Sequence, residues 1–449
     1  MKKQIDVPLR RFFATIAVLG FSAFYVLETS GGAHAQSKGL TVTVEASKRG
    51  YRNMPVSVII SKKEIGTTNL SGYLMLIPKS GGSVLRAQVE PAGADVRLTF
   101  LLDDLPKGTK RVYKLSQVLF IKAPDKQVSV SLKGEDVEVA FDNKIFTRYS
   151  TAGAPNKPIF YPILSPEGDC LTRKWPIDAT SLPGESSDHP HHRGLWFTHG
   201  SVNGIDFWSE GDGTGKTVNV GYEELKSGWV FGAFRARTEW RIPNLKKADV
   251  SRPSPKSRLA DRVIAADTRD VRVYLLPNGD RLMDIQITMT PLGGALTFGD
   301  TKEGTFGLRL PDALAVAPDK SAKIAATGHI ETSTGVSGAS AWGKPAEWID
   351  CWGDLNGKTQ GVAIFDSPAN LRHPQTWHTR TYGLFAVNPF GLHDFRGTKT
   401  NEGEYVLPVG KTLAFSYRLL FHKGDTGVAR ISEQYSAFID PPKAEVGRE

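Results

Sequence analysis

Histidine is concentrated in one short segment of this chain. Ten histidines occur in 449 residues, and four of them fall between His189 and His199. Imidazole titrates near neutral pH, so a cluster of histidines suits proton transfer and equally suits the binding of zinc, copper or iron. For any single histidine, a structural role is the alternative. The catalytic candidates of this segment are His191, His192, Arg193 and His199, and the candidate metal ligands are His189, His191, His192 and His199.

The local sequence predicts how these side chains are presented. Pro190 prevents a helix through this point and favours an extended residue before it. In a strand over residues 193–199, side chains alternate between two faces, so His199 shares a face with Arg193 and Trp196 lies on the other. Asp188 either orients a histidine or caps a turn, and the pattern leaves both roles open.

The residues that follow predict a binding surface for a sugar. A tight turn is expected at Asn203-Gly204, and Asp206 and Trp208 come next. Indole faces stack on the apolar face of a pyranose, although packing into a core is the more common fate of tryptophan. The substrate-binding candidates here are Asp188, Trp196, Asn203, Asp206 and Trp208.

Two later segments add charged groups. Glu303 is the preferred base or ligand, with Lys302 beside it to favour its charged form, and an ordinary charged turn is the alternative. His378 and Arg380 point the same way in an extended segment, where an arginine beside a histidine suits a carboxylate or a developing oxyanion. A structural ion pair is the alternative. Asn388, at a predicted turn, completes the binding candidates with Lys302.

The elements that must position these residues are strands. Apolar stretches are short and alternate with polar residues, and 45 glycines and 27 prolines supply turn signals. Residues 36–132 predict a small N-terminal β-sandwich, with Val128–Leu132 as its last strand. Residues 133–425 predict one large antiparallel double-layer β-sandwich, because no long amphipathic helix interrupts the strands. Residues 426–449 predict a C-terminal helix and tail.

The clearest predicted hairpin lies in the second region. Residues 271–275 and 282–290 alternate, and Asn278-Gly279 stands between them. Both residues tolerate positive φ, so this pair is the strongest short-range turn signal. We therefore expect two neighbouring antiparallel strands joined at this point.

Several long motifs of the second region resemble a known family. The motifs are Asp188–Trp196, Val202–Trp208, Asp300–Gly304, Trp348–Asp350 and Pro374–Pro389. They are similar to the exported bacterial family labelled "methane oxygenase PmoA", a domain of unknown function, over roughly residues 134–425. The resemblance implies a role in carbohydrate metabolism. It does not imply methane oxidation, because the mature chain has no apolar run long enough for a transmembrane bundle.

The strand pattern is also similar to the large β-sandwiches of aldose epimerases, a resemblance of fold alone. Those proteins use a histidine acid and a glutamate base on one concave sheet face. By this analogy, His199 or His378 would work with Glu303.

The N-terminal segment predicts export. Four basic residues precede an apolar stretch at Phe12–Val26, and Ala33-His34-Ala35 fits a signal-peptidase site. We therefore expect a signal peptide over residues 1–35, read by the general or the twin-arginine route, and a periplasmic or extracellular protein. An uncleaved anchor is the alternative. Export permits a disulfide between Cys170 and Cys351, and two free thiols are the alternative.

These observations support three hypotheses. The first is an exported carbohydrate-active protein that uses His/Glu acid–base chemistry on a sugar or uronate, as an epimerase, lyase or hydrolase. The second is a metal-dependent enzyme with the histidine cluster as ligands and a divalent metal as cofactor. The sequence indicates no other cofactor. The third is a non-catalytic glycan-binding or envelope protein. The partner in each case is a small molecule or glycan, since no nucleic-acid motif is present.

Overall fold

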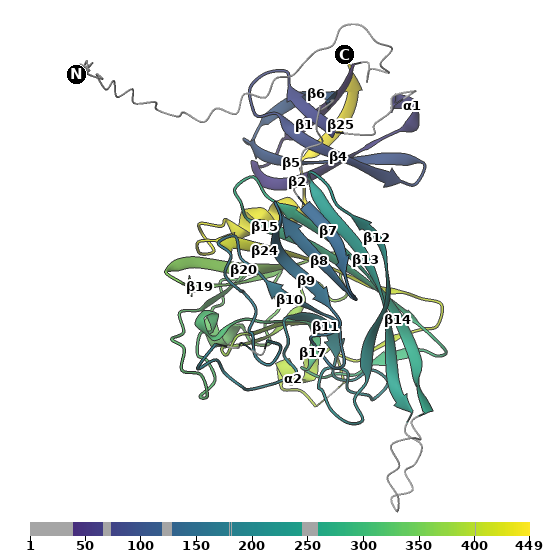
Figure 1. Ribbon diagram of the computed structural model, residues 1–449, viewed down its shortest axis with the longest axis vertical. Coiled ribbons are helices and arrows are strands. Elements are labelled where there is room, and N and C mark those ends of the chain that lie inside the picture. The colour runs from purple at the N-terminus through teal and green to yellow at the C-terminus, as the bar shows by residue number, and fades with distance from the viewer. Residues whose placement is uncertain are drawn as a thin grey trace, which may run out of the picture. The chain divides into compact units, whose positions relative to one another are not determined.

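A computed structural model describes residues 39–65, 73–118, 128–178, 180, 182–244, 259–399 and 401–449 (Figure 1). The predicted signal peptide, residues 1–35, lies outside these residues. Almost all regular structure is antiparallel β-strand, which confirms the all-β prediction. No helix within the described ranges is long and apolar enough to cross a membrane.

The N-terminal strands form one sheet with its own core. In spatial order the strands are β2 (Tyr51–Ile60), β5 (Asp95–Leu105), β4 (Leu85–Ala92), β3 (Tyr73–Pro78), β6 (Thr109–Val118), β1 (Leu40–Ala46) and β25 (Lys443–Arg448). A short helix, α1 (Lys62–Ile65), follows β2. Alternate residues of β2, such as Met54, Val56 and Val58, are buried, as a strand with one covered face requires. The end strands β2 and β25 contact each other, so the sheet curls onto itself.

The C-terminus differs from its prediction. The helix is present as α3 (Ile431–Ile439), but the tail after it forms strand β25. β25 pairs with β1 in antiparallel register, with Val446 opposite Val42 (yellow beside purple in Figure 1). The alternation in Lys443–Arg448 is weak and its partner lies at the other end of the sequence, so local pattern did not reveal this strand.

One strand belongs to a different sheet from the one expected. Val128–Leu132, which we placed at the end of the N-terminal region, forms β7 (Val128–Lys133). β7 pairs along its length with β8 (Asp136–Phe141). It is therefore an edge strand of the large sandwich, and the hairpin between the two strands explains why they are neighbours.

The second region consists of two large antiparallel sheets. The first sheet, called here the β11 sheet, runs in the order β21 (Thr376–Arg380), β22 (Leu384–Asn388), β17 (Gly304–Arg309), β11 (Leu195–His199), β10 (Ile159–Ile163), β9 (Lys144–Ser150), β8 and β7. The second sheet, the β15 sheet, runs in the order β12 (Lys216–Lys226), β13 (Phe231–Asn244), β14 (Leu259–Leu275), β15 (Arg281–Pro291), β24 (Leu413–Lys423), β20 (Lys358–Asp366), β19 (Trp348–Leu355) and β18 (His329–Thr332).

Small elements connect the large strands. They are the paired strands β16 (Leu296–Phe298) and β23 (Tyr405–Leu407), the 3-10 turns Asp312–Leu314 and Gly338–Ala341, and the helix α2 (Leu392–Arg396). The connection between β14 and β15 is the predicted hairpin, with Leu275 opposite Arg281 and Gly279 at a φ of +89°.

Apolar side chains from both large sheets meet in one core. Met283, Ile285 and Ile287 of β15 alternate into it, and Leu195 and Phe197 of β11 enter it from the other sheet. Burial of this shared face is the main force that holds the two layers together. The opposite face of the β11 sheet is left for the loops that carry the predicted site. Cys170 and Cys351 are both free thiols, so the disulfide is not formed.

Candidate functional site

Strand β11 carries the histidine-dense segment into its sheet. Gly194, just before the strand, has a φ of +56°, and a Cβ there would lie 2.3 Å from the carbonyl oxygen of Phe160. Only glycine fits this close approach. Beyond it the predicted alternation holds: Leu195 and Phe197 enter the core, and Trp196 packs on the opposite face. The strand begins at Leu195, two residues later than expected.

His199 lies apart from the other histidines of the segment. Its side chain is fully buried, its Nε2 is 2.8 Å from the carbonyl oxygen of Gly299, and its ring packs against Phe298 and Phe390. Burial lowers the pKa of His199 to about 4. These contacts place it inside the sandwich, so it does not share a site with the loop histidines.

The two tryptophans expected to stack on sugar are buried. Trp196 and Trp208 have exposed fractions of 2% and 0%, and their ring centroids lie 5.0 Å apart. They pack with Leu384 and Ala386 into a small apolar cluster on the outer face of the β11 sheet. Core packing, the alternative interpretation, therefore describes both of them.

Asp188 and His189 form a hydrogen-bonded pair, which we call the dyad. His189 Nδ1 lies 2.6 Å from Asp188 Oδ2, and Asp188 Oδ1 accepts from Arg173 Nη1 at 2.5 Å and from Arg309 Nη2 at 2.7 Å. The Asp188 side chain is only 9% exposed, whereas 42% of the His189 side chain is exposed. Of the two roles open for Asp188, orientation of a histidine is the one its contacts fit.

The dyad's carboxyl is held in its charged form. Burial alone raises the pKa of Asp188, but the hydrogen bond from His189 and the charges of Arg309 and Arg173 together lower it well below its usual range. A permanently charged carboxylate keeps the proton of the His189 ring on Nδ1. Nε2 then has no hydrogen-bond partner in the described part of the chain.

Aromatic rings support the exposed imidazole. The His189 ring stacks on Tyr382 with centroids 5.0 Å apart, and on His192 at 4.8 Å. His192 is buried, and burial, with repulsion from His191, lowers its pKa well below the usual range. Neither ring nitrogen of His192 has a hydrogen-bond partner among the described residues. His192 is therefore a neutral ring beneath the dyad, and it is not exposed as an acid or base.

His191 and Arg193 follow the dyad in the sequence, and their side chains have different surroundings. His191 is half-buried, and burial, followed by the charge of Lys157, lowers its pKa to about 4. Arg193 is engaged by Glu210, with Nε 3.0 Å from Oε1 and Nη2 3.0 Å from Oε2. Lys157, fully buried, also contacts Glu210 at 3.1 Å. Arg193 thus belongs to a structural ion-pair network, the alternative to a catalytic role.

His378 and Arg380 hold each other at the edge of the β11 sheet. Arg380 Nε donates to His378 Nε2 at 3.2 Å, so the ring proton sits on Nδ1, which donates to the Lys302 carbonyl oxygen at 2.5 Å. Burial lowers the pKa of His378 to about 4, in agreement with a neutral ring. With both nitrogens bonded, His378 acts as a positioning residue. The Arg380 guanidinium lies 4.9 Å from the Trp342 ring.

Glu303 stands on the loop that His378 helps to fix. Its carboxylate is 3.4 Å from Lys302 Nζ, and both side chains are 36% exposed. Asn388 Nδ2 donates to the carbonyl oxygens of Thr301 and Lys302 at 2.9 and 3.0 Å. Asn388 therefore shapes this loop, and Glu303 is the carboxylate that faces solvent.

The hydroxyl of Tyr382 lies within the electrostatic influence of charged residues from distant segments. Burial raises the pKa of Tyr382 to about 12; the charges of Arg309 and Arg380 lower it, and those of Asp188 and Glu303 raise it. These four residues come from three separate parts of the sequence, since Glu303 directly precedes β17 and Arg309 ends it. The charges of Glu303 and Arg380 therefore act on the same tyrosine whose ring stacks on His189.

Two further binding candidates support turns. Asn203 Oδ1 accepts the backbone N–H of Thr297 at 2.7 Å, and Asp206 Oδ1 accepts that of Trp208 at 2.7 Å. Asn203 has a φ of +52°, as the predicted tight turn requires. These hydrogen bonds stabilise turns of the fold, and none of them connects Asn203 or Asp206 to Tyr382.

The four histidines proposed as metal ligands do not form one donor set. His199 lies in the core, while His189, His191 and His192 pack against one another by their ring faces and edges. Among the residues that the structure describes, no group of three or more His, Cys, Asp or Glu side chains is arranged to hold a metal ion.

Sequence reasoning missed several residues of this group. Tyr382 lies inside one of the quoted motifs, and its nearness to His378 was an available signal. Arg173 and Arg309, which hold Asp188, carry no local signal, because they approach it from distant strands and loops. Lys157 and Glu210 were missed for the same reason.

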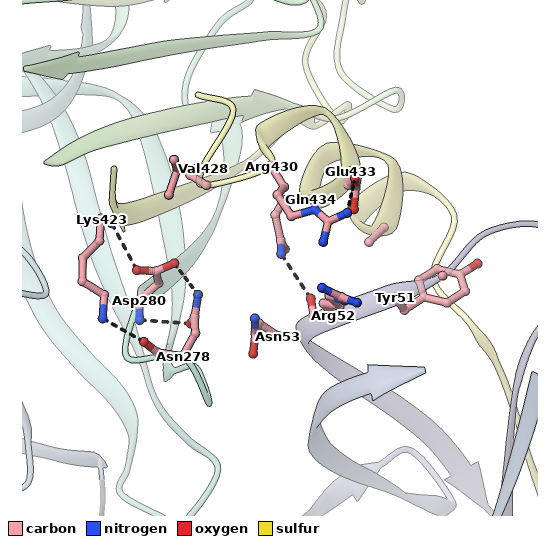
Figure 2. A pocket seen from close by; sticks show the side chains of 13 residues that line it. Tyr51, Arg52, Asn53, Asn278, Asp280, Lys423, Val428, Arg430, Glu433 and Gln434 are labelled. Carbon is pink, nitrogen blue, oxygen red and sulfur yellow. Dashed lines mark hydrogen bonds and ion pairs between the residues drawn. The ribbon is translucent and has the colours of Figure 1, made fainter. Parts of the chain in front are cut away.

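Two clefts lie away from this group. The first, about 260 Å³ in volume, lies between β2 and α3, where Gln434 donates to the Arg52 carbonyl oxygen at 3.1 Å (Figure 2). Asp280, in its wall, accepts from Asn278 Nδ2 at 2.6 Å. The cleft contains none of the predicted site residues, and several of its polar groups bond to one another, as for Arg430 and Glu433 in Figure 2.

The second cleft, about 470 Å³, covers β13, β14, β15 and β24. Its floor is a ladder of cross-strand ion pairs, with Arg235 2.6 Å from Asp270 and Arg418 2.6 Å from Asp284. None of the predicted site residues lines it. Each of its charged side chains has an oppositely charged partner, as expected for a structural surface.

Comparison with known proteins places the chain in a family. A family model described as "Family of unknown function (DUF6807)" matches residues 136–436. The chain belongs to this family. Apart from β7, the DUF6807 match covers the two large sheets and the whole group around Tyr382, and its description carries no methane-oxygenase label. No curated protein matches the chain.

Solved structures similar to this DUF6807 member come from Enterococcus faecalis. One is a protein in glycosyl hydrolase family 38, with 9% identity and a TM-score of 0.38, covering 92% of this chain and 47% of that one. The other is an alpha-mannosidase of strain V583, with 10% identity and a TM-score of 0.38, covering 92% and 46%. The chain spans about half the length of these proteins, and likeness at this level carries no argument about activity.

Proposed function

We propose that this chain is an exported carbohydrate-active protein that performs acid–base chemistry on a sugar or uronate at the Asp188–His189 dyad. The observation that carries the proposal is the dyad itself. An exposed imidazole is oriented by a buried carboxylate, which two buried arginines hold in turn. A histidine fixed in one tautomer beside open solvent is suited to move protons at its free nitrogen.

Each residue of the group has a separate role in the proposed chemistry. His189 Nε2 takes or gives the proton, and Asp188 stabilises the imidazolium when it forms. Glu303, the exposed carboxylate of the group, is the second acid or base, as aldose-epimerase-like chemistry with a histidine and a glutamate would need. Arg380 supplies positive charge for an oxyanion. The proposal keeps the predicted chemistry but moves the histidine role from His199 and His378 to His189.

The export part of the proposal rests on the first thirty-five residues. Their basic start, apolar centre and small-residue cleavage motif favour a periplasmic or extracellular location. Fractionation of cells that express the full chain, with the N-terminus of the mature protein read by mass spectrometry, tests this part separately.

Proton transfer can be tested before the substrate is known. The protein is incubated in D₂O with a panel of hexoses, hexuronates and their disaccharides, and each sugar is analysed for carbon-bound deuterium, for new products and for the rate at which its anomers interconvert. We expect exchange or conversion of at least one sugar. In His189→Gln and in Glu303→Gln the rate should fall by roughly 100-fold or more, since a positioned acid or base contributes about that much.

His329→Gln is the matched control. His329 is exposed on β18, stacked on Trp352, and belongs to the other sheet. It should leave the rate unchanged. Undiminished rates in both site variants would refute the proposed mechanism. Saturable sugar binding with neither exchange nor product would instead identify a binding module.

A further inference from the structure

Arg380 is rigidly held yet has no acidic partner. Its Nε donates to the neutral His378 ring at 3.2 Å, and its guanidinium lies over Trp342 at 4.9 Å. The other arginines of this face differ: Arg173 and Arg309 bind Asp188, and Arg193 binds Glu210. Within the described residues, no carboxylate lies within ion-pair distance of Arg380.

The contacts of Arg380 with the described residues leave its terminal NH₂ groups without a hydrogen-bond partner. His378 takes only Nε–H, and the ring of Trp342 covers one face of the guanidinium without using a hydrogen-bond donor. The terminal NH₂ groups remain, in the planar fork that matches both oxygens of a carboxylate. Because His378 is neutral, it does not cancel the charge of Arg380.

Arg380 also lies close to the reaction centre. It is two residues from Tyr382 in the chain, and the Tyr382 ring stacks on His189 with centroids 5.0 Å apart. An anionic group bound to Arg380 would therefore sit beside the dyad. The same residue would both select a charged substrate and orient it toward His189.

We propose that Arg380 binds the carboxylate of an acidic sugar, so that the substrate class of this site is uronates or uronate-containing glycans. The inference rests on the proposed function, because it places the carboxylate next to the dyad. The carboxylate accepts two parallel hydrogen bonds from the Arg380 fork, with Trp342 beneath the ion pair. Neutral sugars lack this anchor.

A local readout makes the test independent of turnover. The protein is labelled with ¹⁵N-tryptophan, and the Trp342 indole signal is assigned by its loss in Trp342→Phe. Sodium galacturonate, its methyl ester, galactose and inorganic sulfate are titrated separately. We expect galacturonate to shift the Trp342 signal and to bind roughly 10- to 100-fold more tightly than the ester, the typical strength of charge-assisted bonds.

Variants complete the test. Arg380→Gln should remove the preference for galacturonate over its ester, and Arg380→Lys should recover only part of it, because lysine lacks the fork. Arg430→Gln, far from the site and paired with Glu433, should change nothing. The inference is overturned if wild type binds acid and ester equally, if none of the four probes shifts Trp342, or if sulfate binds as tightly as galacturonate.

The two proposals can fail separately. Selective galacturonate binding that depends on Arg380, without deuterium exchange in any sugar, would sink the acid–base function and retain the carboxylate site. Deuterium exchange into neutral sugars, with no Arg380-dependent preference for acidic sugars, would retain the acid–base function and sink the carboxylate site.

Discussion

At the scale of single residues, the histidines of this protein differ in role because their partners differ. His199 is enclosed by phenylalanines, His378 has both nitrogens bonded, and His192 is buried under another ring. His189 and His393 are both partly exposed beside a carboxylate, Asp188 and Asp300 respectively. Of these two carboxylates, within the described residues, only Asp188 is paired in turn with buried arginines. The dyad is therefore where acid–base chemistry is best supported.

Replacing Asp188 tests how much the fold depends on the dyad's carboxylate. Asp188→Asn leaves Arg173 and Arg309 buried without their counter-charge, so the free energy of unfolding should fall by about 3 kcal/mol or more. Urea unfolding of wild type and variant measures the difference.

The pH dependence of that difference has a defined sign. The pKa of Asp188 is lower in the folded than in the unfolded chain, so its contribution is complete above about pH 4 and is lost as the pH falls further. The gap between wild type and variant should be constant near neutrality and shrink in acid. A gap that persists unchanged at pH 2 would contradict the ion-pair account.

Residue type and spacing allowed part of this site to be predicted. The density of histidine located the loop, and the order Asp188, His189 was already compatible with an oriented imidazole. Which histidine is exposed could not be predicted, because that depends on Tyr382 and Arg309, contributed by other strands. The tryptophans were ambiguous for the same reason: burial is decided by what packs on them.

At the scale of elements, the start of β11 determines where the dyad loop lies. Gly194 joins the loop to the strand at positive φ, against the backbone of Phe160. The strands themselves were predictable from period-two patterns, and the β14–β15 hairpin from Asn278-Gly279. The pairing of β7 with β8 and of β25 with β1 was not, because strand partners are chosen by non-local contacts.

Gly194→Ala should displace the loop. The added Cβ would meet the Phe160 carbonyl oxygen at 2.3 Å, in addition to the cost of about 1 kcal/mol for a non-glycine residue at positive φ. We expect a loss of unfolding free energy clearly above that value. Gly204→Ala, at a φ of +78° with open space around it, should show the conformational cost alone. Equal losses in the two variants would contradict the close-approach argument.

At the scale of the whole molecule, the sandwich places loops from distant parts of the chain on one face of the β11 sheet. The clefts over β2 and α3 and over the β15 sheet contain charged side chains that pair with one another, such as Arg430 with Glu433 and Arg235 with Asp270. The group around Tyr382, in contrast, combines an exposed imidazole, an exposed carboxylate and an unpaired guanidinium. An all-β double layer could be predicted from the sequence, but the face on which its loops gather could not.

Histidine-selective acylation followed by peptide mass spectrometry tests the central claim most directly. With limiting diethyl pyrocarbonate, His189 should be modified early, together with the exposed His329, while the buried His192, His199 and His378 stay protected. Modification of His189 should abolish deuterium exchange into sugar, whereas modification of His329 should not. Protection of His189 in the free protein, or full exchange activity once it is acylated, would contradict the account.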